Sequence, residues 1–361
     1  LYGTVKDDEA GNFFYSPFSI SIALAMTYAG AENSTETEMA DVLSFDLPEP
    51  ELHQAFNALD ADLATRGTGN ASQFRLNVAN AIWGQTGYHF EQSFLDTIAL
   101  NYGSGLNLLD FMADPEGART TINDWVEEKT EDRIKDLIPQ GAIGSDTRMV
   151  LTNAIYFWGE WVNIFPKDST SPGAFHTDAN GDVSVDFMHI EANYNYYAGT
   201  GYEAIELPYK GDDNSMIIIA PDAGTMGAFE STLDATLLSS IIAGFTPTEM
   251  SFAMPKFEFE HRLGLKEILM NMGLTAPFTA GVADFSGLNG STDLVITDVL
   301  HKAFVAVDEK GTEAAAATAV IVGETSVAPN FVSIDRPFIF LIRDKVTGTI
   351  LFMGRMVDPS L

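Results

Sequence analysis

The side chains that most often carry catalysis fall in no catalytic pattern in this chain. Six histidines are present, and none has the H-E-x-x-H spacing of a zinc protease. The sequence also lacks a G-x-S-x-G nucleophile elbow, a Walker A loop and a G-x-G-x-x-G fingerprint. Cysteine is absent, which excludes thiolate catalysis, disulfides and cysteine-based metal sites. We therefore do not expect an enzyme, and we predict neither a metal nor a cofactor.

The charge balance argues against one class of partner. Lysine and arginine total 19 against 51 acidic residues, a net charge of −32. With so few lysines and arginines, binding to a phosphate backbone would release few counterions. We therefore expect no nucleic-acid partner. No apolar run is long enough to span a bilayer, so no membrane partner is expected either. The acidity suits high solubility, a secreted protein or a salt-rich cytoplasm, and composition does not choose among these.

One stretch has an unusual composition: Asp308-Glu-Lys-Gly-Thr-Glu-Ala-Ala-Ala-Ala-Thr-Ala-Val-Ile-Val-Gly-Glu-Thr-Ser-Val-Ala-Pro329. As a helix, Thr312 would be the N-cap before a run of alanines, the best helix formers. As a strand, one face would carry only small or β-branched side chains, which fit between neighbouring strands. A segment that suits both structures is a candidate for a moving part. The alternative is an ordinary Ala-rich helix followed by a surface loop.

Hydrophobic patterns predict the elements around this stretch. Phe13 to Gly30 reads as a short strand that turns, through Ser16 and Pro17, into a helix apolar nearly all round and therefore buried. Met149 to Phe157 predicts a central strand covered on both faces, and Leu294 to Val307 a long strand leading into the stretch. Helices dominate early and strands late, which indicates an α+β protein. Without an internal repeat or a low-complexity linker, residues 1–361 are expected to form a single domain.

Several blocks in the same order resemble the serpin family over essentially the whole chain. These blocks are Asn12 to Ile20, Thr152 to Trp161, His301 to Glu313, Val332 to Ile342, and Leu351 to Pro359. The resemblance implies a metastable α+β fold with three β-sheets, about nine helices and an exposed reactive-centre loop from about Gly311 to Ile334. It places Leu1 inside the family's first helix, so we expect a trimmed chain in which a signal peptide would not be visible. The acidity and the lack of cysteine favour a prokaryotic member.

The resemblance also implies a function, the suicide-substrate inhibition of serine proteases. In this family the target protease cuts one loop bond, and the freed loop inserts into the main sheet before the covalent acyl-enzyme hydrolyses. An inserting strand needs a small inward face, and the loop hinge here matches inhibitory members. Its residues are Gly311, Thr312, Glu313, Ala314, Ala315, Ala316, Ala317 and Thr318. The alternative is a non-inhibitory serpin-fold binding or carrier protein.

Alignment with the family from both ends of the loop places the cleaved bond at Thr325-Ser326. Thr325 before the cut suits elastase-like or subtilisin-like proteases, which have small, uncharged primary pockets. No lysine or arginine lies between Gly311 and Ile334, which disfavours trypsin-like targets. A register shifted by one residue would put Glu324 there and favour an acid-specific protease.

The resemblance carries over two groups of residues that control loop insertion. Ser16, Ser19, Asn153 and His301 match a polar cluster beneath the centre of the main sheet. Trp161, Lys256 and Glu309 match the place where the loop first inserts. Each has a purely structural alternative: Ser16 as a strand end, Trp161 as core, and Lys256 with Glu309 as a weak surface ion pair.

The remaining expectations concern partners and location. Some serpins bind heparin through a basic helix, but Arg66 is the only lysine or arginine in the corresponding segment, Glu51 to Arg66. Activation by heparin is therefore not expected. We expect an extracellular or secreted monomer whose partner is a serine protease held in a covalent complex.

Overall fold

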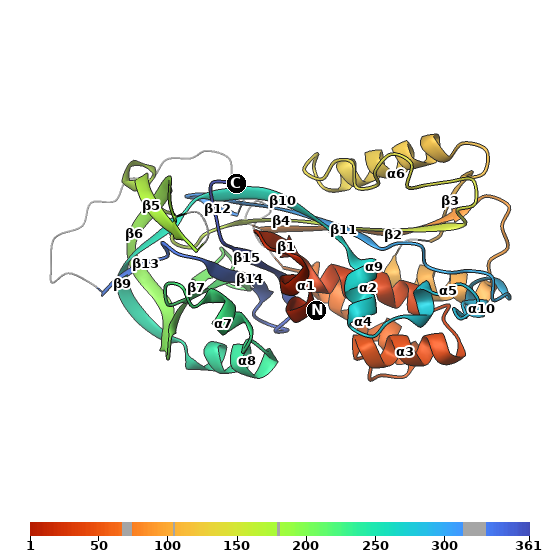
Figure 1. Ribbon diagram of the computed structural model, residues 1–361, viewed down its shortest axis with the longest axis horizontal. Helices are drawn as coiled ribbons and strands as arrows, with labels where there is room; N and C mark the ends of the chain where they lie inside the picture. Colours follow the sequence, from red (N-terminus) through yellow and green to blue (C-terminus); the bar gives the residue numbers. More distant parts are fainter. Residues whose placement is uncertain (67–73, 104, 179–180, 313–329) are drawn as a thin grey trace.

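The computed structural model describes residues 1–66, 74–103, 105–178, 181–312 and 330–361. Within these ranges the chain forms ten α-helices and fifteen β-strands (Figure 1). The helices are α1 (Tyr2–Asp8), α2 (Pro17–Tyr28), α3 (Asn33–Leu43), α4 (Glu49–Leu63), α5 (Gln92–Tyr102), α6 (Pro115–Lys129), α7 (Met226–Glu230), α8 (Ala235–Gly244), α9 (Leu265–Asn271) and α10 (Ser286–Asn289).

The strands form two hydrogen-bonded sheets within the described residues. The first, which we call the main sheet, has the order β10 (Phe257–Gly264), β11 (Leu300–Val307), β12 (Gly311–Thr312), β4 (Met149–Glu160), β2 (Phe74–Gln85) and β3 (Asn107–Leu109). The second has the order β1 (Phe13–Tyr15), β15 (Ile350–Met356), β14 (Phe338–Asp344), β8 (Asn214–Pro221), β7 (Tyr202–Pro208), β6 (Gly181–Gly199), β9 (Thr246–Pro255) and β13 (Asn330–Ser333), with β5 (Ser171–Thr177) beside β6.

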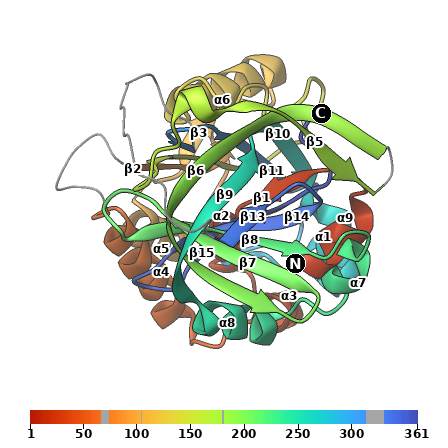
Figure 2. The ribbon, with the colours of Figure 1, turned by 90° about the vertical axis from the view of Figure 1, so that its left-hand side faces the viewer.

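The family resemblance implied three sheets, and the difference in count comes from β6. This strand is 19 residues long. Along residues 187–196 it pairs with β9, and along residues 195–199 it pairs with β7. The strands on the β9 side and the strands on the β7 side are thus joined through β6 into one hydrogen-bonded sheet. Figure 2 shows β6 and β9 running side by side across this end of the molecule.

The main sheet is covered on both faces, which explains why its central strand is apolar. Helix α2 contacts β2 and β4, and α6 also contacts both strands. The two helices lie on opposite sides of these strands (Figure 1). Ser16 caps α2 by accepting a hydrogen bond from the backbone of Ser19, and Pro17 occupies the first turn. The predicted strand and buried helix at Phe13 to Gly30, and the predicted central strand at Met149, are therefore present.

Candidate functional site

The main sheet is divided at one end and closed in the middle. Strand β12 lies between β11 and β4, antiparallel to both: Thr312 pairs with Val307 and with Gly159. Below this point β11 and β4 pair directly in parallel, from His301 opposite Asn153 to Phe304 opposite Tyr156. A strand that continued inward from Thr312 would have to break this direct pairing.

Gly311 and Thr312 fit tightly into the divided end. A side chain on Gly311 would overlap the carbonyl oxygen of Gly159, so close backbone approach requires glycine at this position. Thr312 is 1% exposed, and its hydroxyl lies 2.7 Å from the hydroxyl of Tyr209. Burial raises the pKa of Tyr209, so the phenol stays protonated at neutral pH. The ring of Tyr209 stacks on Trp161 with centroids 4.5 Å apart.

Trp161 and Glu309 hold the turn between β11 and β12. The indole of Trp161 donates to the carbonyl of Asp308 at 3.0 Å, and its backbone N–H donates to the carbonyl of Lys310 at 2.6 Å. Lys256 donates to both carboxylate oxygens of Glu309, at 3.0 and 3.2 Å, and Thr170 donates at 2.8 Å. We call Trp161, Tyr209, Lys256, Glu309 and Thr312 the hinge cluster.

The ion pair in the hinge cluster is partly buried. The side chain of Glu309 is 8% exposed, and that of Lys256 is 34% exposed. Burial alone would raise the pKa of Glu309, but its backbone hydrogen bond, Lys256 and Thr170 outweigh this effect and hold the pKa below its usual value. Glu309 is therefore ionised at neutral pH. Its bonds to Lys256 and Thr170 hold the turn that leads into β12.

A second group of polar side chains lies beneath the closed part of the main sheet. Asn153 of β4 donates to the carbonyl and hydroxyl oxygens of Ser19, each at 2.7 Å, and to the side-chain oxygen of Asn80 at 2.8 Å. Its own side-chain oxygen accepts from Nδ1 of His301, and Nε2 of His301 accepts from the backbone of Ser16 at 3.1 Å. We call these residues, Ser16, Ser19, Asn80, Asn153 and His301, the central polar cluster. It links α2 to β2, β4 and β11, the strands that loop insertion would separate or shift.

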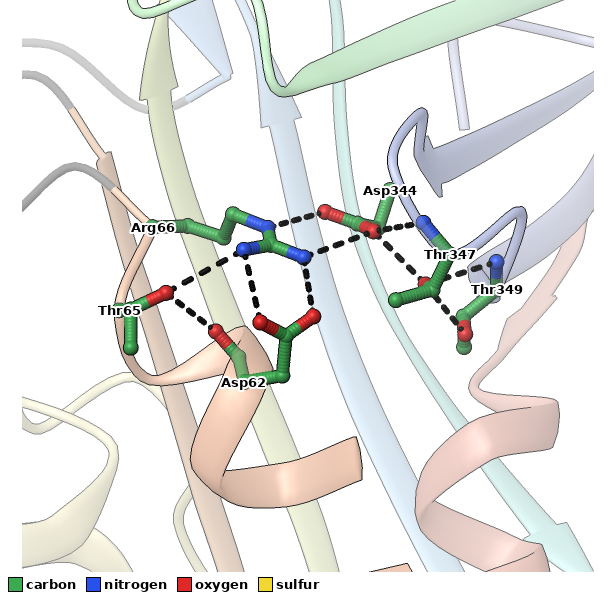
Figure 3. Close-up of polar contacts among 6 residues, drawn as sticks. All are labelled: Asp62, Thr65, Arg66, Asp344, Thr347 and Thr349. Atoms are coloured by element: carbon green, nitrogen blue, oxygen red, sulfur yellow. Dashed lines mark hydrogen bonds and ion pairs between the residues drawn. The ribbon is translucent and has the colours of Figure 1, made fainter. Parts of the chain in front are cut away.

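Arg66, the cation just after α4, is fully engaged in ion pairs (Figure 3). Its guanidinium donates to Asp344 at 2.7 Å and to Asp62 at 2.5 Å. Asp344 is buried and also accepts from the backbone and hydroxyl of Thr347, both at 2.7 Å. This network ties the end of α4 to the β14–β15 hairpin. The guanidinium is thus used inside the protein and does not present a basic surface.

Comparison with known protein families matches residues 1–359 to the serpin (serine protease inhibitor) family. This chain belongs to the serpin family. Its relatives include an uncharacterized serpin-like protein of Thermococcus kodakarensis, 39% identical, with 97% of this chain and 81% of that protein covered. The leukocyte elastase inhibitor of Xenopus tropicalis is 36% identical, with 99% and 96% covered.

Solved structures show the same serpin fold. Uncleaved ovalbumin aligns with a TM-score of 0.90 and 26% identity, covering 99% of this chain and 97% of ovalbumin. Serpin48 of the insect Tenebrio molitor aligns with a TM-score of 0.86 and 32% identity, covering 99% and 94%. The serpin family and the α+β fold, both expected from the sequence, are confirmed.

The structure of this serpin brings together all seven predicted control residues, in two groups. Ser16, Ser19, Asn153 and His301 are joined in one hydrogen-bond network, and Trp161, Lys256 and Glu309 lie in another. Gly311 and Thr312 lie in the main sheet as strand, not as helix. The other hinge residues, 313–318, and the predicted cleaved bond at Thr325 and Ser326 lie outside the described residues.

Sequence reasoning missed three residues of these networks. Asn80 carried only a weak signal, because the strand before Trp83 also contains the polar residues Arg75 and Asn77. Tyr209 and Thr170 gave none, since each is an ordinary polar residue near the end of an element. Tyr209 joins the hinge cluster because β4, β7 and β12 meet at one place, and Thr170 reaches Glu309 of that cluster from the segment just before β5.

The burial of His301 in this serpin predicts a pH-dependent stability. Burial, with a smaller contribution from His261, lowers the pKa of His301 to about 3. The unfolded chain, with an ordinary histidine, binds this proton near pH 6.5, so stability should fall as pH drops from about 7 towards 3. We expect the His301→Gln variant to lose about 2 kcal/mol less than the wild type between pH 7 and pH 5 in urea unfolding. Parallel stability curves for the two proteins would contradict the buried neutral imidazole.

Proposed function

We propose that this serpin is a suicide-substrate inhibitor of serine proteases. The observation that carries the proposal is the position of β12, which already lies between β4 and β11 at the end where the loop begins. The residues that follow Thr312 in the sequence alternate small side chains, so the same strand can lengthen between its neighbours. A proline or a charge on that face would block the strand ladder or bury an unpaired ion.

The chemistry belongs to the protease, and the serpin supplies the conformational change. The protease serine adds to the carbonyl carbon of Thr325, and the bond to Ser326 breaks with Ser326 leaving as a free amine. An ester then joins the protease to Thr325. Insertion of the freed loop separates β11 from β4 and carries the esterified protease with it. Inhibition results when insertion is faster than hydrolysis of the ester.

The proposed targets are elastase-like or subtilisin-like proteases. Thr325 is small and uncharged, and residues 311–334 contain no lysine or arginine. The leukocyte elastase inhibitors of Xenopus tropicalis and Xenopus laevis, each 36% identical to this chain, support the same class. We further propose that the protein acts outside the cell as a monomer, without a cofactor. Heparin should leave inhibition unchanged, because the guanidinium of Arg66 is bound to Asp62 and Asp344.

A second candidate is a serpin-fold carrier whose loop is not used. The solved structure of thyroxine-binding globulin in complex with thyroxine, with a TM-score of 0.87 and 28% identity, favours keeping this alternative. A carrier would be cleaved in its loop without trapping the protease.

The test is incubation with subtilisin and with an elastase-like protease, followed by denaturing gels and mass spectrometry. We expect a covalent complex that survives denaturation, together with a released fragment that begins at Ser326. A fragment beginning at Thr325 would shift the register by one residue. Complete cleavage with undiminished protease activity would contradict inhibition and favour the carrier.

A further inference from the structure

The sheet beside the loop exposes a phenylalanine on its outer face. Phe331 of β13 is 67% exposed, and it is the one aromatic ring among the exposed large apolar side chains in the described part of the chain. Its neighbour Val332 is buried, as the alternation of a strand requires. An exposed aromatic ring on a regular strand is typical of interfaces, where such residues often dominate the binding energy.

Carboxylates lie on the same face. Phe331 pairs with Ser251 of β9, and Ser251 pairs with Glu191 of β6, so the three side chains form one row across the sheet. In the next row on this face Asn193 pairs with Glu249. Glu191 and Glu249 are both exposed. We call Phe331, Ser251, Glu191, Asn193 and Glu249 the acidic face.

The lysine and the arginine that lie nearest to the acidic face along the chain are already paired with carboxylates. Lys256, just after β9, binds Glu309, and Arg336, just after β13, binds Glu203 at 2.8 Å. The acidic face therefore keeps its negative charge in a protein whose net charge is already −32. A partner with lysine or arginine around an apolar contact would match it.

Chain length brings the target protease near the start of β13, beside the acidic face. Phe331 is five residues beyond Ser326, and five residues span at most about 18 Å. A protease domain of about 220 residues has a radius of gyration of about 17 Å, hence a diameter above about 40 Å. A protease bound at Thr325 and Ser326 is wider than this tether is long, so its surface must come close to the start of β13.

We propose that the acidic face is an auxiliary docking surface for the target protease, in addition to the reactive loop. Phe331 makes an apolar contact beside the protease active site, and Glu191 and Glu249 attract lysine or arginine on the protease surface. This inference rests on the proposed inhibitory function and adds a selection among proteases with similar primary pockets. Cationic elastase-like enzymes are favoured over anionic ones, through the rate of association.

The test measures the association rate constant of the full chain with a cationic elastase-like protease. Phe331→Ala is expected to lower this rate about tenfold, as for an interface hot spot. The pair Glu191→Gln and Glu249→Gln is expected to lower it about fivefold at low salt and to weaken its salt dependence. The stoichiometry of inhibition should not change, because loop insertion sets it. The side chains are exposed, so the melting temperatures should stay at the wild-type value.

Matched controls lie away from this end of the molecule. Leu100→Ala removes an exposed apolar side chain of α5, and Asp124→Asn with Glu128→Gln removes two carboxylates of α6 (Figure 1). A synthetic peptide of residues 319–334 with and without the Phe331→Ala change tests whether the phenylalanine acts without the folded sheet. The docking surface would be overturned if the acidic-face variants associated as fast as the controls. It would also be overturned if Phe331→Ala lowered the association rate of the free peptide by the same factor. Failure of the wild type to form any covalent complex would instead overturn the proposed function.

Discussion

Thr312→Arg is expected to convert the protein from an inhibitor into a substrate. Thr312 is 1% exposed and lies between β4 and β11, so an arginine there would bury an unpaired charge or expel β12 from the sheet. An uncompensated buried charge costs several kcal/mol, and each 1.4 kcal/mol added to the insertion barrier slows insertion about tenfold. We therefore expect the stoichiometry of inhibition to rise at least about tenfold. The measurement is the molar excess needed to abolish protease activity.

Two further variants sharpen this prediction. Thr312→Ser keeps a small side chain and the hydroxyl that faces Tyr209, so it should inhibit like the wild type. Ala316→Pro, beyond the described residues, removes a backbone N–H from the inserting strand and should also produce a substrate. If Thr312→Arg or Ala316→Pro still traps protease at the wild-type stoichiometry, insertion between β4 and β11 is not the basis of inhibition.

Asn153→Ala is expected to be the most destabilising change in the central polar cluster. The substitution leaves Nδ1–H of His301 without its acceptor and removes three hydrogen bonds to Ser19 and Asn80. A buried polar group without a partner costs about 1–3 kcal/mol, so we expect a total loss of about 3 kcal/mol in urea unfolding. Because the cluster ties α2 to the closed part of the sheet, the variant should also convert more rapidly to an inactive, loop-inserted form.

Asn77→Ala is the matched control for this prediction. Asn77 lies on β2 and donates to Glu131 at 3.3 Å on the solvent side. Its removal should change stability by no more than about 0.5 kcal/mol. Equal effects of the two substitutions would mean that the central polar cluster does not hold the sheet closed.

Local patterns predicted the elements better than their ends or their pairing. The strand expected from Leu294 begins only at Leu300. Ile296 and Val299 are buried, but they belong to a loop in which the backbone of Ile296 donates to the carbonyl of Pro277. Apolar residues in a buried loop resemble a strand in the sequence, because both bury the same side chains.

The cluster residues that could be predicted came from the family resemblance and not from spacing. Ser19 and Asn153 are 134 residues apart, and Tyr209 and Thr312 are 103 apart. Their contacts depend on which strands pair and in which register, and single-sequence patterns do not specify this. Asn80 shows the limit most clearly, because nothing in the sequence distinguishes its amide, which bonds Asn153, from the solvent-side amide of Asn77 on the same strand.

Thermal unfolding before and after loop cleavage tests the central claim most directly. The claim is that the native sheet is incomplete and that the freed loop completes it between β4 and β11. About ten added residues of strand, each contributing about 1 kcal/mol, should raise the melting temperature on the order of 20 °C after cleavage within residues 313–329. Cleaved Thr312→Arg should show a much smaller rise. An unchanged melting temperature for the cleaved wild type would contradict insertion and leave the serpin fold with a different function.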